Sequence, residues 1–286
     1  MENRERNRAG TMSSGIAGAA GEWLSRGSLD CLSVEVVLND PHTPYRLLVR
    51  RKDGRTQGAI TCVSLLTVRG MWFLECRPPS EGVALVEAFQ GRPVKLTTSG
   101  KVKAAIRTAL LKRWKLPREH DLLAMVCRRS LGSGSGRWAT ESDRHALEAY
   151  QAAYNKERDT AINPDWHDLV DRKQVAVLDV DGHPAAFLKR TGMTTKCVCI
   201  GGTYTLPEYR RQGLARRLTA FVVGESLRER PAVHLIVDDD NAPAIALYDS
   251  LGFRTAGRCY MAYFGEEKQA VLPAPPPRRG ARRSGR

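Results

Sequence analysis

The sequence predicts an α/β fold with a mixed α+β sheet, arranged as two successive units. Short runs rich in β-branched and apolar residues alternate with segments of helical periodicity along most of the 286 residues. A Ser/Gly run at 131–136 has linker composition and separates an earlier unit from a later one. The later unit closes in the order strand, helix, strand, helix, strand, which implies a parallel strand pair joined by a right-handed crossover.

Composition divides the chain into four parts. Residues 1–27 mix Arg and Glu with small residues and are expected to be disordered. Residues 28–130 are expected to form an α+β domain and residues 134–270 a second α/β domain. Residues 271–286 are Pro- and Arg-rich and are expected to be a disordered tail, which holds much of the net charge of +14.

The composition also limits the compartment and the partners. No stretch approaches the ~18 apolar residues that a membrane span requires, and the N-terminus lacks the apolar core of a secretory signal. The seven cysteines form an odd set without a CxxC pair, which is typical of reduced, buried thiols. We therefore expect a cytoplasmic protein with no membrane partner and no metal.

Local patterns place the elements of both units. In the first unit, strands are predicted at 45–51, 59–66, 71–76, 94–98 and 122–128, and helices at 80–89 and 101–114. In the second unit, strands are predicted at 137–139, 175–180, 185–189, 197–205, 233–238 and 253–264, and helices at 140–156, 163–169, 210–228 and 242–250. The helix at 101–114 is strongly basic; a solvated face over a buried stripe is favoured over a nucleic-acid surface.

The stretch from Thr205 to Ala215 combines arginines with small residues at the junction of a strand and a helix. Amide N–H groups at a helix N-terminus are unsatisfied, and the helix dipole favours anions such as a pyrophosphate. Gly213 and Ala215 allow close approach of the backbone, while arginines on both sides supply positive charge. Taken alone, a glycine between arginines is also typical of an ordinary turn.

A second informative stretch begins at Asn241. Asn241 can cap the following helix, Pro243 is tolerated in its first turn, and Gly252 can end it. Tyr248 lies about two turns after Asn241 and therefore on nearly the same face, so its phenol can face the groove that Asn241 borders. The alternative is that Tyr248 only packs and Asn241 only caps.

Together, the two stretches resemble the GNAT superfamily of N-acetyltransferases, over roughly residues 137–265. The segment Arg210-x-x-Gly213-x-Ala215 resembles the acyl-CoA pyrophosphate loop of that family. The segment Asn241-x-x-Ala244-x-x-Leu247-Tyr248-x-x-Leu251-Gly252-Phe253 resembles its second cofactor-contacting helix. The first unit has a comparable succession of strands and helices without either motif, and we interpret it as a degenerate GNAT-like half.

The resemblance implies a site for acetyl-CoA in the second unit. In the family, two parallel strands splay apart and the pantetheine arm lies between them; here these strands would be 197–205 and 233–238. Tyr248 is then implied to be the acid that protonates the departing thiolate. The implied cofactor-binding residues are Thr203, Tyr204, Thr205, Arg210, Arg211, Gln212, Gly213, Leu214, Ala215, Arg216 and Asn241.

The sequence departs from the family at the general base. Many members carry a Glu on the strand before the loop, whereas residues 197–205 contain no carboxylate. Glu157 is the candidate base, because that region commonly lines the acceptor side in the family; a solvated charge is the alternative. His234 can also be considered, but a histidine on a buried strand is more often a packed residue.

The leading functional hypothesis is transfer of the acetyl group of acetyl-CoA to a primary amine of a small molecule, peptide or protein. The partners would be acetyl-CoA and an amine acceptor. One alternative is an aminoacyl-tRNA-dependent transferase, which the intact pyrophosphate loop disfavours. Another is a non-catalytic basic module that binds nucleic acid or regulates, which Tyr248 disfavours. The acceptor itself is not determined by fold.

Overall fold

The computed structural model describes residues 4–5, 14–27, 29, 31–52, 58–91 and 93–265. Its strands are β1 (Arg4–Glu5), β2 (Tyr45–Arg51), β3 (Ile60–Thr67), β4 (Met71–Cys76), β5 (Lys95–Ser99), β6 (Arg118–Cys127), β7 (Arg137–Trp138), β8 (Val175–Val180), β9 (His183–Met193), β10 (Val198–Thr205), β11 (Val233–Asp238) and β12 (Arg254–Tyr263). Its helices are α1 (Ser14–Ser25), α2 (Ser33–Asn39), α3 (Pro79–Ala88), α4 (Lys103–Arg113), α5 (Arg144–Arg158), α6 (Trp166–Asp171), α7 (Leu214–Leu227) and α8 (Ala242–Ser250).

All of these strands belong to one mixed sheet. Its order is β1-β2-β3-β4-β5-β12-β6-β11-β10-β9-β8-β7. The two halves of the chain repeat one succession, since β2-β3-β4-α3-β5-α4-β6 corresponds to β8-β9-β10-α7-β11-α8-β12. Each half contains one parallel pair, β4 with β5 and β10 with β11. The mixed α/β fold expected from the sequence is therefore confirmed.

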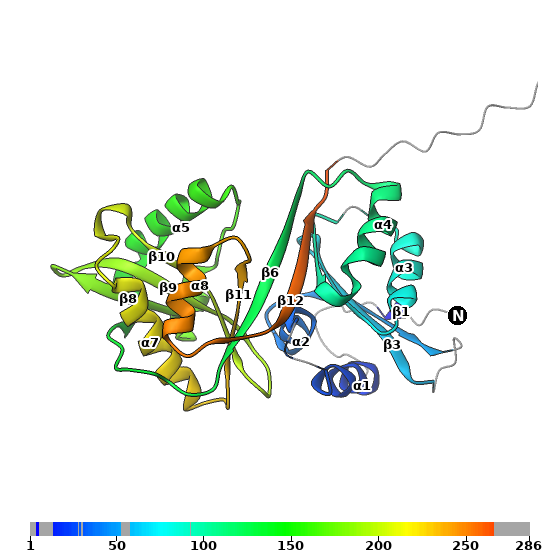
Figure 1. Cartoon of the computed structure of the whole chain (residues 1–286), viewed down its shortest axis with the longest axis horizontal. Coiled ribbons are helices and arrows are strands. Elements are labelled where there is room, and N and C mark those ends of the chain that lie inside the picture. Colours follow the sequence, from blue (N-terminus) through cyan, green and yellow to red (C-terminus); the bar gives the residue numbers. More distant parts are fainter. Residues whose placement is uncertain are drawn as a thin grey trace, which may run out of the picture.

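The two halves exchange their last strands at the centre of the sheet. β6 lies between β11 and β12, and β12 in turn pairs with β5 of the first half. In Figure 1, β6 and β12 run side by side between the two groups of helices. Linker composition places the division at 130–134, whereas β6, which precedes it, is hydrogen-bonded to two strands that follow it. Composition carries no information on such long-range pairing.

Helices cover both faces of the sheet. α7 and α8 pack with Met125 and Leu235, while α3 and α4 pack with Trp72 and Tyr260. The antiparallel register of β6 and β12 puts these two groups on the same face. α5 and α6 pack against β8 and β9 on the opposite face, where α1 also covers β3. On that opposite face, Ile236 of β11 lines a pocket over the central strands.

The expectation that residues 1–27 are disordered is wrong for Ser14–Ser25, which form α1. Ala20 and Leu24 of this helix are buried against Val63 and Leu65 of β3. The Gly- and Ala-rich composition hides the helix in the sequence, because its stability comes from packing on the sheet rather than from helix propensity. The predicted tail at 271–286 lies outside the described residues.

Two properties expected from composition can be compared with the structure. All seven cysteines are free and buried, as expected. Three basic residues of α4 form ion pairs with acids of neighbouring elements: Lys103 with Asp121, Arg107 with Glu119 and Lys112 with Glu87. In the part of the chain that the structure describes, no helix has the length and apolar character needed to cross a bilayer.

The strand exchange predicts that residues 134–270, produced alone, do not form a stable monomer. Without β6, the strands β11 and β12 each lose a long antiparallel partner and expose their hydrogen-bonding edges. The buried side chains of Met125 and Cys127 are lost from the core as well. Size-exclusion chromatography and circular dichroism would show aggregated or unfolded protein.

A fragment of residues 115–270, which keeps β6, is the matched control and should be the more compact of the two. Coexpression of residues 1–130 with residues 134–270 should restore a folded complex. A folded monomer of residues 134–270 alone would contradict the importance of the exchange.

Candidate active site

The site begins where two parallel strands separate. β10 and β11 lie wholly in the described part of the chain, and they pair only at Val198 with Val233 and at Cys199 with His234. Beyond these pairs the strands diverge, so that their facing backbone groups do not hydrogen-bond to each other. In the first half, β4 and β5 stay paired over four residues, from Met71 with Lys95 to Leu74 with Thr98. Only the second half therefore has an open V between its parallel strands.

A bulge in β10 accompanies the opening. The register between β10 and β9 shifts between Gly201 and Tyr204, and Gly202 has a φ of +63°, which a glycine adopts without strain. The phenol of Tyr150 on α5 donates a hydrogen bond of 2.7 Å to the carbonyl oxygen of Gly202. A Cβ at Gly202 would lie only 2.7 Å from the side chain of Lys189. Contacts with Tyr150 and Lys189 therefore hold the bulge in place, and it lies on β10 just beyond the last pair with β11.

The V opens into a cleft of about 790 Å³. Its walls come from β6, β10, β11, β12, the end of α5 and the start of α8. The lining residues used below are His120, Glu157, Arg158, Thr203, Ala215, Asp238, Asn241 and Tyr248. The V, both predicted motifs and strand β6 of the first half therefore all contribute residues to the wall of one cleft.

The N-terminus of α7 is exposed at one end of this cleft. Helix α7 begins at Leu214 and not at Arg210 as predicted, because Arg211 and Gly213 have φ values of +63° and +73° and cannot belong to the helix. Among the described residues, no side chain caps this terminus, and no atom lies within 4 Å of a Cβ built at Gly213. The first-turn amides of α7 thus face open space in a conformation suited to an anion.

The predicted loop residues have different surroundings in the structure. Arg210 forms an ion pair of 2.6 Å with Glu157 and donates to the carbonyl oxygen of Thr205. Arg216 donates to the hydroxyl of Ser250. Leu214 is buried in the core, so only its backbone can meet a ligand. Arg211 and Gln212 are exposed beside the helix terminus.

Tyr204 and Thr203 point to opposite sides of β10. The ring of Tyr204 packs against Tyr150 and Tyr154 of α5, whereas Thr203 lines the cleft. Of the strand residues 203–205, only Thr203 therefore presents a side chain beside Tyr248.

Glu157 lies at the wall of the cleft, held by two donors. Arg210 donates to its Oε2 at 2.6 Å and the phenol of Tyr204 donates to the same oxygen at 3.1 Å. The hydrogen bond from Arg210 holds the pKa of Glu157 below its usual value. A carboxylate stabilised in this way is a weaker proton acceptor, so the geometry favours a positioning role for Glu157 over that of a base.

Tyr248 and Asn241 lie on the same helix and both line the cleft. Asn241 caps α8, as its position in the sequence predicts, by accepting a 3.2 Å hydrogen bond from the amide of Ala244. Tyr248 is 9% exposed, and its phenol donates to the hydroxyl of Thr203 at 3.3 Å across the V. Burial raises the pKa of Tyr248, so the phenol keeps its proton at neutral pH.

A histidine that sequence reasoning missed also lines the cleft. Nδ1 of His120 on β6 lies 2.9 Å from Oδ1 of Asp238 on β11, and Arg158 approaches the other oxygen of Asp238 at 3.7 Å. A carboxylate only accepts hydrogen bonds, so Nδ1 donates and Nε2 is left free to accept a proton. The two residues are 118 positions apart and meet only through the strand exchange. No local signal could have revealed this pair.

His234 lies elsewhere. Its ring is buried on β11, with Nδ1 3.8 Å from the sulfur of Cys199, and it borders a separate, smaller cavity. Within the described ranges, no group of three or more His, Cys, Asp or Glu side chains is arranged to hold a metal ion.

One family model matches part of the chain. Residues 140–253 match the model of the acetyltransferase (GNAT) family. A search of curated proteins finds no match.

Solved structures resemble most of the chain at low identity. An acetyltransferase of the GNAT family from Colwellia psychrerythraea superposes with a TM-score of 0.60 at 12% identity, covering 93% of this chain and 100% of that one. A GCN5-related N-acetyltransferase from Kribbella flavida has a TM-score of 0.52 at 18% identity, with coverages of 89% and 96%. A tandem GNAT protein from the clavulanic acid biosynthesis pathway has a TM-score of 0.50 at 15% identity, with coverages of 90% and 98%. These likenesses concern the fold, and they extend over both halves.

Proposed function

We propose that this protein transfers the acetyl group of acetyl-CoA to a primary amine, since residues 140–253 match the model of the acetyltransferase (GNAT) family. The observation that carries the proposal is the V between β10 and β11, bordered by the hydroxyls of Thr203 and Tyr248. Its unpaired backbone groups can accept a ligand as an added strand, and it leads from the open N-terminus of α7 to the cleft.

The residues present fit acetyl-CoA. The amides at the start of α7, with Arg211 and Arg216 beside them, would hold the pyrophosphate. The free edges of β10 and β11, with the side chains of Thr203 and Asn241, would hold the pantetheine arm. When bound, acetyl-CoA supplies an acetyl group activated as a thioester.

Tyr248 is suited to act as the general acid. Its raised pKa keeps the phenol protonated, and Thr203 fixes the direction of the hydroxyl within the V. The phenol can therefore give a proton to a leaving sulfur. Backbone N–H groups of β10 that lack a strand partner can polarise the carbonyl under attack.

We assign the base to His120. Asp238 accepts a hydrogen bond from Nδ1 of His120 and so fixes the tautomer in which Nε2 points to the cleft as an acceptor, as the acid does in other histidine–carboxylate pairs. His120 can then take the proton that the amine releases on attack. Glu157 positions Arg210 and Tyr204 instead, at the junction of α5 with the loop before α7.

The first prediction concerns Gly213. Gly213→Asp should weaken acetyl-CoA binding by at least about tenfold, or ~1.4 kcal/mol, because a carboxylate there repels the pyrophosphate. Isothermal titration calorimetry should find one site per chain in the wild type. The matched control is Gly182→Asp, since Gly182 also has a positive φ of +79° and no atom within 4 Å of a Cβ. Equal affinities of the two folded variants would exclude α7 as the anion site.

The second prediction is that Tyr248→Phe lowers the acetylation rate by about 10²-fold while acetyl-CoA affinity stays nearly unchanged. The ring still packs against Phe253, and only the proton donor is removed. Release of CoA thiol would be followed over a panel of primary amines at saturating acetyl-CoA. The control is Tyr45→Phe, in the first half of the chain. It also removes the hydroxyl of a buried tyrosine, which donates to the carbonyl oxygen of Leu38. A wild-type rate for Tyr248→Phe would remove this residue from the mechanism.

The third prediction separates the two candidate bases. His120→Gln should reduce kcat/KM for the amine by about 10²-fold or more, whereas Glu157→Gln should have the smaller effect on kcat. Affinity for acetyl-CoA measured by calorimetry should survive His120→Gln, because His120 lies apart from the start of α7. His183→Gln, at an exposed hairpin position, controls for the loss of a histidine. The reverse ranking of His120 and Glu157 would restore Glu157 as the base.

A further inference from the structure

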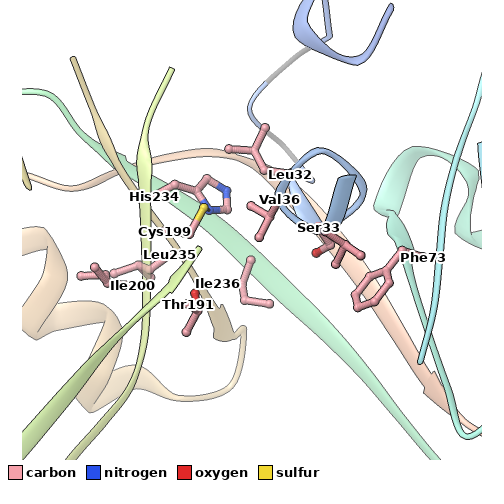
Figure 2. Close-up of a pocket in the computed structure, with 11 residues that line it drawn as sticks. Leu32, Ser33, Val36, Phe73, Thr191, Cys199, Ile200, His234, Leu235 and Ile236 are labelled. Carbon is pink, nitrogen blue, oxygen red and sulfur yellow. The ribbon is translucent and has the colours of Figure 1, made fainter. Parts of the chain in front are cut away.

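A second cavity lies at the closed end of the V, on the face of the sheet that α2 covers. It measures about 190 Å³ and is lined mainly by apolar side chains. Figure 2 shows Cys199, His234 and Ile236 of the sheet pointing toward Leu32 and Val36 near α2. Phe73 of β4 borders its far side, and Thr191 of β9 borders it as well.

This cavity adjoins the proposed acetyl-CoA site directly. Leu235 and Ile236 line both the cavity and the main cleft. On β10, Cys199 and Ile200 line the cavity, and the next two residues, Gly201 and Gly202, line the cleft. A group that enters the V as an extended chain and points toward its closed end therefore faces this apolar space.

We propose that the cavity is a subsite for the acyl group, and that the enzyme transfers acyl groups of roughly four to six carbons in preference to acetyl. An apolar cavity of about 150 Å³ is large enough to bind benzene, so a cavity of this size can take a six-carbon chain. The apolar side chains of the cavity can contact the methylene groups of a longer acyl chain, whereas the methyl of an acetyl group would leave most of the cavity empty.

The chemistry is the proposed transfer with a longer acyl group. The amide C–N bond forms as the thioester C–S bond breaks. The amine proton passes to His120, and the sulfur receives a proton from Tyr248. The inference rests on the proposed function, but the length of the acyl group is an independent property that can be tested by binding alone.

The test measures the affinity of acetyl-, butyryl-, hexanoyl- and decanoyl-CoA by calorimetry without an acceptor, followed by kcat/KM for each with one amine. Affinity should rise by about fourfold per added methylene up to hexanoyl and then fall at decanoyl. Affinities independent of chain length would overturn this inference and leave the proposed function intact. Failure to bind any CoA thioester would overturn both.

Two variants of opposite effect locate the subsite. Thr191→Phe narrows the cavity from an exposed strand position and should abolish the gain from butyryl and hexanoyl while acetyl-CoA affinity stays unchanged. Phe73→Ala enlarges the cavity and should move the optimum toward longer chains. Thr255→Phe, the same change at an exposed position on β12 that borders neither cavity, is the control.

The outcomes are distinct. An unchanged chain-length profile in both Thr191→Phe and Phe73→Ala would show that the acyl group does not enter this cavity. A change in the KM of the amine, without a change in the chain-length profile, would assign the cavity to the acceptor and overturn the proposal.

Discussion

The antiparallel pairing of β6 with β12 is the constraint on which the rest of the structure depends. It joins two strands that end the two halves of the chain, and each is hydrogen-bonded on its other edge to the opposite half. Because β6 takes the place beside β11, its residue His120 faces the same cleft as Asp238. The first half, which lacks both predicted motifs, thus supplies a side chain to the cleft of the second half.

The two halves share one topology but differ in how far their parallel strands are paired. In the second half, the bulge at Gly202 and the early end of pairing between β10 and β11 leave room for a ligand. In the first half, β4 and β5 remain paired, and the buried rings of Trp72 and Trp114 pack with the half-buried rings of Phe89 and Phe264, the last of which follows β12. Equivalent chain segments are therefore a cleft in one half and a packed core in the other.

Local sequence signals predicted much of the fold. The strands at 71–76 and 233–238 and the helix at 242–250 agree with the structure to the residue, because turn-forming or capping residues bound them. The predicted helix at 210–228 begins four residues before α7, since the left-handed backbone at Arg211 has no local sequence signal. The helices α1 and α2 were missed because packing rather than periodicity defines them.

The site was predictable to the extent that it lies within contiguous motifs. Asn241 and Tyr248 line the cleft, and Gly213 lies two residues before Ala215, which lines it as well. The ion pair of Arg210 with Glu157 and the hydrogen bond of His120 with Asp238 join residues far apart in the sequence. Whether such residues lie within hydrogen-bonding distance is decided by the fold and not by their spacing in the sequence.

The shared centre of the sheet also bears on how the molecule loses its structure. Neither half can detach as a rigid body without breaking two long ladders at once, since β6 and β12 are each held on both edges. Unfolding is therefore expected to be a single cooperative transition despite the internal repeat. Partial opening, with its exposed strand edges and its aggregation risk, becomes rare in the native ensemble.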